Sequence, residues 1–314
     1  MENKKMTIAN FNIVFGESEE PLLNYFHTAI MPAFKNQFVR TRGNIEYTFL
    51  KVDVIEVGED DYALTGIIVK KTMLEIRSKF DEAENLIETN EVYPTAPYSL
   101  FVIYLKNHRM TLVKNQKGSP DLKSFSATFK MMLNSYIREE NIRRKENEEK
   151  ALPIPDINIV GIPMKASIEE ALKSVSKINK LTLKFYPLNG DLDFSGLFEG
   201  LTTDLRKKVG SKTGSVVLNS PTSISGVTDV IAEAQGTVEP VFKVTFENRS
   251  KGTITNGTLS ESMDIVIDKD SVARELEQIA NKAKKFESIL TVSEGNRKIF
   301  EEKKSNIIPF VSRR

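Results

Sequence analysis

His27 and His108 are the residues of this 314-residue chain whose type best suits proton transfer near neutral pH. Cysteine is absent, which excludes disulfides, thiolate metal sites, iron–sulfur clusters and a cysteine nucleophile. Two histidines are too few for a multi-histidine zinc or iron site within one chain. His108 follows Asn107 in an expected polar turn, and we interpret it as an exposed turn residue because no nucleophile motif accompanies it. His27, inside an apolar segment, is interpreted as a core or boundary residue. The sequence predicts no catalytic residue and no cofactor.

An acidic segment has the residue types of a metal-dependent nuclease, which needs carboxylates and a lysine. Its members lie close together in the sequence: Asp53, Glu56, Glu59, Asp60 and Asp61. No Pro-Asp pair followed by an Asp/Glu-x-Lys strand is present, and strands ending in acids are common. A nuclease is therefore the runner-up hypothesis, and no metal ligand is assigned.

The segment Gly210–Ser215 contains the glycine, lysine and threonine of a phosphate-binding loop. Such a loop needs a Gly-Lys pair with a second glycine five residues earlier, and it runs from a strand into a helix. Here Lys212 follows Ser211, and the expected order is helix to strand. We interpret the segment as a surface connection.

Positive charge beside aromatic residues is the more informative functional pattern. Arg40 and Arg42 lie between Phe38 and Tyr47 in an expected loop. Further cations follow one expected hairpin and its helix: Lys106, Arg109, Lys114, Lys117, Lys123 and Lys130. Lysine and arginine neutralise phosphates with little demand on geometry, so this set is expected to hold DNA or RNA without reading bases; a solvated face is the alternative. A second candidate set lies in the other half of the chain: Lys207, Lys208 and Lys212, with Arg249 and Lys251.

The charge distribution supports this pattern more than the net charge of +1 does. Residues 51–100 carry 5 basic and 11 acidic side chains, a net of −6, whereas residues 101–145 carry 10 basic and 3 acidic, a net of +7. A basic stretch that gathers on one face would attract a polyanion.

Strand and helix signals show which elements must position these residues. In the N-terminal half, strands are expected at Thr7–Phe15, Tyr47–Val57, Tyr62–Val69, Tyr98–Leu105 and Arg109–Val113, the last four as two hairpins. Leu22 to Phe34 is expected to be helical until Pro32 interrupts it. Ser119-Pro120-Asp121 predicts a helix start with a hydroxyl cap, and apolar residues then recur at helical spacing: Leu122, Phe125, Phe129, Met132, Leu133 and Tyr136.

The second half alternates strands and helices. A β-α-β unit is expected from the strand Ile157–Ile162, a helix from Ser167 through Ile178, and the strand Leu181–Tyr186. Further elements are a helix lined by Leu197, Leu201, Leu205 and Val209, a helix at Val227–Ala234, and strands at Ser215–Leu218, Val238–Glu247, Gly252–Thr255 and Ser262–Ile267. They predict a mixed sheet packed by helices.

The chain is too long for one usual hydrophobic core, so we expect an α+β protein of two domains, residues 1–150 and 151–314. The first is β-rich and ends in a long helix with a charged extension over residues 138–150.

A final helix from Ser271 to Leu290 carries an apolar heptad stripe, which packs on its own domain or pairs across a dimer. The tail from Arg297 to Arg314 is expected to be mobile. No apolar run reaches membrane-spanning length, so a cytoplasmic location is expected.

The order of elements, with the strand pair that begins Pro-Tyr-Ser-Leu-Phe-Val at residues 97–102 and the helix that starts at Ser119-Pro120, resembles the RexA family of lambda-phage exclusion proteins. It is also similar to the DNA-binding subunit of the Kiwa defence system. The resemblance covers most of the chain in layout and carries no diagnostic motif. It implies sequence-tolerant DNA binding, homodimerisation, a role in anti-phage defence, and a membrane-protein partner within a defence system.

The leading hypothesis is a non-enzymatic DNA-binding protein, with DNA favoured over RNA, that acts in phage defence or exclusion. A metal-dependent nuclease and a protein-interaction scaffold are the alternatives.

Overall fold

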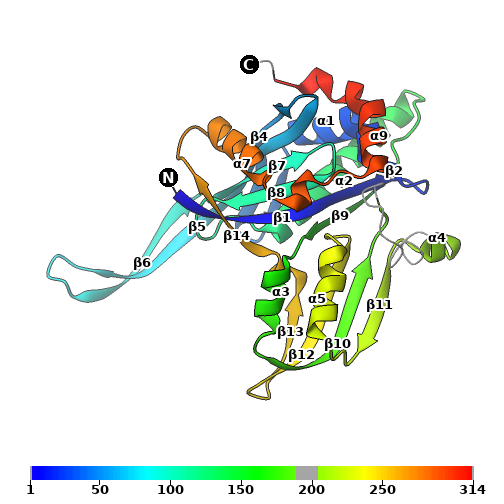
Figure 1. Ribbon diagram of the computed structural model, residues 1–314. Helices are drawn as coiled ribbons and strands as arrows, with labels where there is room; N and C mark the ends of the chain where they lie inside the picture. Colours follow the sequence, from blue (N-terminus) through cyan, green and yellow to red (C-terminus); the bar gives the residue numbers. More distant parts are fainter. Residues whose placement is uncertain (1, 189–203, 313–314) are drawn as a thin grey trace.

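The computed structural model describes residues 2–188 and 204–312, and its backbone is an α+β fold built on two antiparallel sheets (Figure 1). The large sheet has the strand order β14-β1-β8-β7-β5-β4-β3, with β2 and β9 also paired to β1 and β6 paired to β5. Its strands are β1 (Glu2–Phe15), β2 (Glu20–Pro21), β3 (Val39–Arg42), β4 (Ile45–Gly58), β5 (Asp61–Phe80), β6 (Leu86–Thr95), β7 (Tyr98–Tyr104), β8 (Arg109–Lys114), β9 (Pro155–Gly161) and β14 (Glu261–Ile267). The α+β class and both expected hairpins are confirmed.

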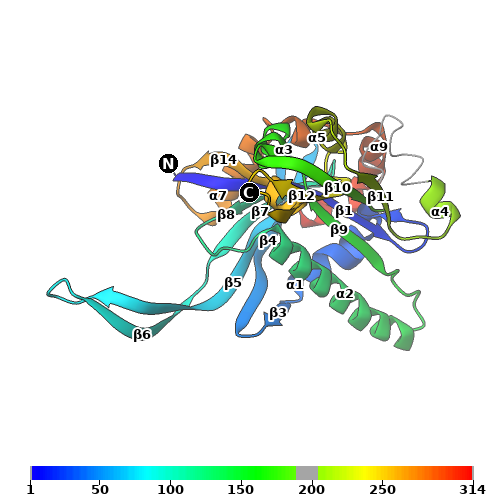
Figure 2. The ribbon, with the colours of Figure 1, turned by 90° about the horizontal axis from the view of Figure 1, so that it is seen from below.

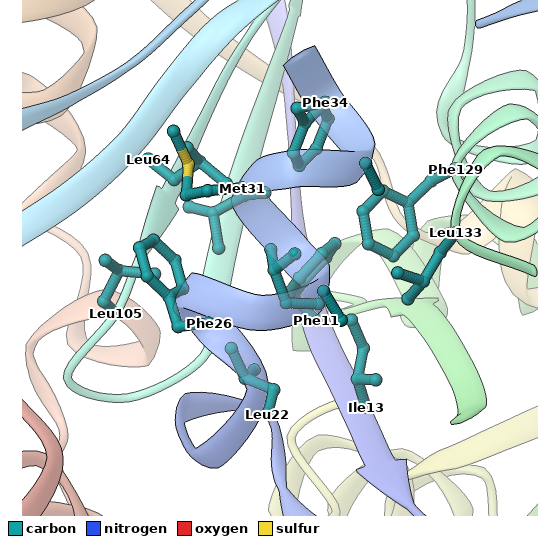
Figure 3. Packing of buried hydrophobic residues seen from close by; sticks show 14 of the residues in the cluster. Phe11, Ile13, Leu22, Phe26, Met31, Phe34, Leu64, Leu105, Phe129 and Leu133 are labelled. Carbon is teal, nitrogen blue, oxygen red and sulfur yellow. The ribbon is translucent and has the colours of Figure 1, made fainter. Parts of the chain in front are cut away.

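One face of the large sheet is covered by a helical segment and by helix α2 (Leu122–Glu146). The segment consists of a 3-10 turn, a π turn and a short α-helix: η1 (Leu22–Tyr25), η2 (Phe26–Ile30) and α1 (Met31–Lys35). Phenylalanines dominate the core between these layers, where Phe11 of β1 lies 5.1 Å from Phe129 of α2, ring centre to ring centre (Figure 3). Pro32 does not interrupt the segment as expected, because it occupies the first turn of α1, where no amide donor is needed.

Helix α2 begins two residues later than the sequence indicated. Its cap is the carboxylate of Asp121, which accepts a hydrogen bond from the Ser124 amide at 2.8 Å, whereas Ser119 accepts one from the Gln116 amide in the preceding turn. The expected apolar stripe is buried against the sheet, and the charged extension is helical as far as Glu146.

The second sheet has four strands in the order β11-β10-β12-β13, all antiparallel, so the expected mixed sheet is wrong. The elements of this part of the chain are α3 (Lys165–Leu172), β10 (Val175–Phe185), α4 (Arg206–Lys208), β11 (Gly214–Asn219), α5 (Ile224–Glu233), β12 (Val238–Phe246), β13 (Lys251–Thr255) and α6 (Asn256–Leu259).

The expected β-α-β unit is wrong as well, because β9 pairs with β1 in the large sheet. The helix expected to include Val175 and Ile178 ends at Leu172, and both residues belong to β10. Leu197 and Leu201 lie outside the described residues.

Three C-terminal helices return to the large sheet: α7 (Val272–Ala283), α8 (Glu287–Leu290) and α9 (Glu294–Lys303), followed by the 3-10 turns η4 (Lys304–Asn306) and η5 (Ile308–Phe310). The expected single helix is therefore divided after Ala283. The stripe of α7 packs on the face opposite α2, within its own chain (Figure 1). The prediction of a mobile tail is wrong: the Phe300 and Ile307 side chains are fully buried in the main core.

The large sheet draws strands from both sides of residue 150, since β9 and β14 both pair with β1. Among the described helices, none combines the length and the apolar character needed to cross a membrane.

Candidate nucleic-acid interface

Strand register brings basic residues to one end of the large sheet. Met6 of β1 pairs with Val113 of β8, which sets Lys5 level with Lys114. Lys114 pairs with Ser99 of β7, and Ser99 pairs with Ile68 of β5. Lys70 lies two residues beyond Ile68 on β5 and pairs with Tyr47 of β4. Tyr47 in turn pairs with Arg40 of β3. Cations from four strands that are distant in the sequence therefore lie along the same end.

These side chains also share one face of the sheet. Directly opposed residues of an antiparallel pair point to the same face, and residues two apart along a strand do so too. Ile68 and Phe49 belong to the core beneath α2, so Lys70 and Tyr47, two residues along from each, face the same side. Arg40 follows Tyr47 onto that face, and Arg42, two residues along β3, does the same.

Arg40 links this row to helix α2. Its guanidinium lies 5.0 Å from the centre of the Tyr47 ring, and its Nη1 donates to the Thr128 hydroxyl at 3.3 Å. A cation over an aromatic face is held in position while its outer edge remains available to a phosphate. The Arg40 side chain is half-buried, whereas Arg42 is exposed.

Helix α2 extends the row with exposed lysines. Lys123 and Lys130, seven residues apart, lie on the same side of the helix and are exposed. No acid occurs between Leu122 and Arg138. Lys117 is exposed in the loop that leads into the helix.

A groove of about 590 Å³ lies where β1, β8 and the start of α2 meet α6 of the second sheet. Three lysines and four hydroxyl side chains line it: Lys5, Lys114 and Lys123 with Thr7, Thr255, Thr258 and Ser260. Burial raises the pKa of the Asp121 carboxyl, but hydrogen bonds from Ser124 and attraction to Lys114 outweigh this, and the pKa is below its ordinary value. The groove therefore combines one capping carboxylate with three ammonium groups.

We define the basic face by the cations of this sheet end and of the adjoining part of α2. They are Lys5, Arg40, Arg42, Lys70, Lys114, Lys117, Lys123 and Lys130. The row from β1 to β3 crosses five strand intervals, or about 24 Å, which is the rise of roughly seven base pairs of duplex DNA. Few acids interrupt it, and one of them, Asp264, pairs with Lys5 at 2.9 Å.

Two of the expected binding residues lie elsewhere. Arg109 begins β8 and Lys114 ends it, so they are separated by about 17 Å. The Arg109 side chain is only 2% exposed, and the Lys106 ammonium group lies 5.3 Å from the centre of the Phe300 ring.

The interpretation of His108 as an exposed residue is wrong: it is buried, with a φ of 53° in the β7–β8 turn. His27, expected in the core or at its boundary, is exposed.

The second candidate set is distant from the basic face. Lys207 lies near the carboxylate of Glu19 at 3.4 Å, and the buried Arg206 contacts the same carboxylate at 2.5 Å. Glu19 follows the end of β1 opposite Lys5. Lys208 and Lys212 are exposed in the same region.

The acidic segment packs against the C-terminal helices. Asp60 pairs with Lys304 at 3.1 Å and Asp61 with Lys284 at 2.6 Å, while Asp53 accepts a hydrogen bond from the Ser312 hydroxyl. Within residues 2–188 and 204–312, no three acidic or histidine side chains form a group suited to a metal ion. The acids that suggested a nuclease thus include three that hold the C-terminal segment.

Sequence reasoning missed Lys5 and Lys70, which join the set only through strand pairing. The period of two along a strand places Lys70 on the same face as Ile68, which was a usable signal for Lys70. No protein-family model matches this sequence, and no curated protein matches it either.

Proposed function

We propose that the chain binds nucleic acid through the basic face, with DNA as the favoured polymer and without reading base sequence. The observation that carries the proposal is the register that aligns Lys5, Lys114 and Arg40 on one face of the sheet. Phosphate contacts by such side chains fix the position of a duplex but carry no sequence information.

The groove beside α2 supports the same proposal. Ammonium groups and hydroxyls on opposite walls can both contact phosphate oxygens, and backbone contacts of this kind come largely from lysine, arginine, serine and threonine. The resemblance in element order to RexA-like proteins supports DNA as the polyanion and phage exclusion in the cytoplasm as the setting.

A paired charge reversal tests the proposal. The variant Lys114→Glu/Lys123→Glu places two carboxylates in the groove, and the matched control Lys177→Glu/Lys243→Glu reverses two exposed lysines of the second sheet. We expect duplex-DNA affinity at low salt to fall on the order of 100-fold in the first variant only, with the slope of log affinity against log salt reduced by about 2. Equal losses in the two variants would contradict the proposal.

A further inference from the structure

The outer half of β5 and all of β6 form a two-stranded arm, residues 72–95, that projects from the body (Figures 1 and 2). Thr72 pairs with Thr95 at the base of the arm, and Phe80 pairs with Leu86 at the tip. At about 3.3 Å per residue, the tip lies about 30 Å from the base. A two-stranded hairpin by itself is marginally stable in water, so an arm of this length gains stability from a further strand.

One side of the arm is an open strand edge. Strand β4 pairs with β5 as far as Glu46, which lies opposite Lys71, and the chain before Glu46 turns away to β3. In the described part of the chain, no strand continues along this side of β5 over residues 72–80. We call this side of residues 72–80 the open edge. It lies in line with β4, at the place where a further strand of the sheet would run.

The direction of the backbone amides shows which groups the open edge presents. The Lys70 amide donates to the Pro97 carbonyl at 2.9 Å, toward the β6–β7 side of β5. The pairing of β5 with β7 continues into its pairing with β6 in one register, and amide directions alternate along a strand, so the amides of Met73 and Glu75 point to the open edge. Pro94, which has no amide, lies opposite Met73 at an outward-facing position of β6. The open edge therefore offers donors and acceptors at the spacing that an added strand needs.

Apolar side chains accompany the open edge on both faces of the arm. Met73 and Leu74 are successive strand residues that point to opposite faces, and they are 50% and 54% exposed. At the base of the edge, a pocket of about 470 Å³ lies between the β3–β4 turn and the start of the arm, and its lining includes Gly43, Met73 and Pro94. Phe80 is exposed at the tip. A long, exposed edge strand with apolar side chains is a template for pairing with another chain.

The charge of the arm selects among possible occupants. Residues 72–95 contain six acids and two basic residues, a net of −4. Both basic residues are engaged within the arm, since Arg77 pairs with Glu75 at 3.3 Å and Lys79 bonds to Glu91. The remaining acids of the arm are Asp81, Glu82, Glu84 and Glu88. At the pocket, Lys71 and Glu46 pair with each other at 3.6 Å and add no net charge.

We propose that the open edge of β5 binds an extended, basic segment of a different protein, which adds a third strand to the arm. In strand addition of this kind, main-chain hydrogen bonds supply the affinity and the side chains supply the specificity. Alternating apolar residues of the segment cover Met73 and Leu74, and its lysines or arginines lie beside Glu82 and Glu84 near the tip. A second copy of the arm, nucleic acid and an anionic membrane surface are all repelled by the net charge of −4.

The first test uses a fluorescently labelled peptide in which valine alternates with lysine, as long as residues 72–80, titrated with the full chain at low salt. We expect saturable binding to one site per chain, and an affinity about tenfold lower when glutamate replaces lysine in the peptide. The variant Glu82→Lys/Glu84→Lys should remove this preference. The control Glu169→Lys/Glu170→Lys, which reverses two exposed acids of α3, should keep it. A peptide that does not bind, or that binds with the same affinity whatever its charge, overturns the proposal.

The second test blocks the backbone of the open edge. Glu75→Pro removes an amide that faces the edge and leaves the bonds to β6 in place, so we expect peptide affinity to fall about tenfold. Glu75→Thr loses the same charge but keeps the amide, and Val92→Pro blocks the other edge of the arm directly opposite Glu75; both should retain most of the affinity. Equal losses in the two proline variants overturn strand addition at β5. Self-association of the natural chain that Glu75→Pro abolishes would assign the edge to a second copy and would overturn the proposal as well.

Discussion

Arg40 of β3 and Thr128 of α2 are joined by a hydrogen bond of 3.3 Å, although they are 88 residues apart in the sequence. The same guanidinium lies over Tyr47, so one side chain ties an edge strand to the long helix that covers the sheet. The two parts of the basic face, strand ends and helix, are thereby held in a fixed relation.

Arg40→Lys keeps the charge but removes the planar group that stacks and bonds. We expect the unfolding free energy to fall by about 1 kcal/mol, from one hydrogen bond and one cation–π contact, and DNA affinity to fall severalfold. Arg42→Lys, at an exposed position on the same strand, is the control and should change neither quantity appreciably. Thermal melts and binding curves of the two variants measure the difference, and identical behaviour would show that the Arg40 contacts do not matter.

Lys4 and Glu275 form a buried ion pair between β1 and α7, with 3.4 Å between Nζ and Oε2. Glu275→Leu leaves the buried Lys4 ammonium with the Asn115 amide oxygen at 3.1 Å and the half-exposed Glu2 carboxylate at 3.7 Å, and we expect a loss of about 3 kcal/mol of unfolding free energy. Lys4→Met/Glu275→Leu removes both charges and should recover most of that loss. Denaturant titrations of these two variants and of Lys4→Met complete the cycle, and purely additive losses would contradict the pairing.

Phe300 of α9 is fully buried and lies over Tyr62 of β5, with 6.3 Å between ring centres. Phe300→Ala should lower the unfolding free energy by about 3–5 kcal/mol, because it opens a cavity in the main core. Ile308→Ala, at a half-exposed position of the same C-terminal segment, should cost less than about 1 kcal/mol. If both substitutions prove equally mild, the segment after Ser293 is not part of the core.

Glu140 of α2 binds Arg143 and Arg144, and its hydrogen bond with Arg143, the largest cause, lowers the pKa of its carboxyl to about 2. A depressed folded-state pKa stabilises the fold above the ordinary value near 4.5, and this contribution disappears as the pH falls toward 2. Glu140→Gln should therefore be less stable than the natural sequence at pH 6 and should lose less stability between pH 5 and pH 2.5. Melting temperatures across that range test the sign, and parallel pH profiles would contradict it.

The hairpins and α2 were predictable because their signals are local. Alternation around Phe49 and Val54, and apolar spacing from Phe125 to Leu133, each specify one buried face. The error at Val175 and Ile178 has a physical cause: short apolar spacing fits both a helix and a strand, and the pairing of β10 with β12 decides between them. The placement of β9 and β14 beside β1 depends on contacts more than a hundred residues apart, which no local pattern encodes.

The part of the candidate site that is local in the sequence was also predictable. Lys114, Lys117 and Lys123 are close in the sequence and remain close in the fold. Arg109 is also basic and close to them in the sequence, but it begins the strand that Lys114 ends. It therefore lies at the other end of the sheet, and it is buried. The arm was not predicted, because nothing in the strand pattern of residues 72–95 shows that both faces are exposed.

The central claim, that the basic face binds a nucleic-acid backbone, is tested most directly by the affinity for duplex DNA at several salt concentrations, with single-stranded DNA and RNA alongside and with Mg²⁺ present and absent. Binding through five or six phosphates predicts that log affinity falls linearly with log salt with a slope of about −5, independently of base sequence and without cleavage. Absence of binding at the lowest salt, or an affinity that does not change with salt, would contradict the account.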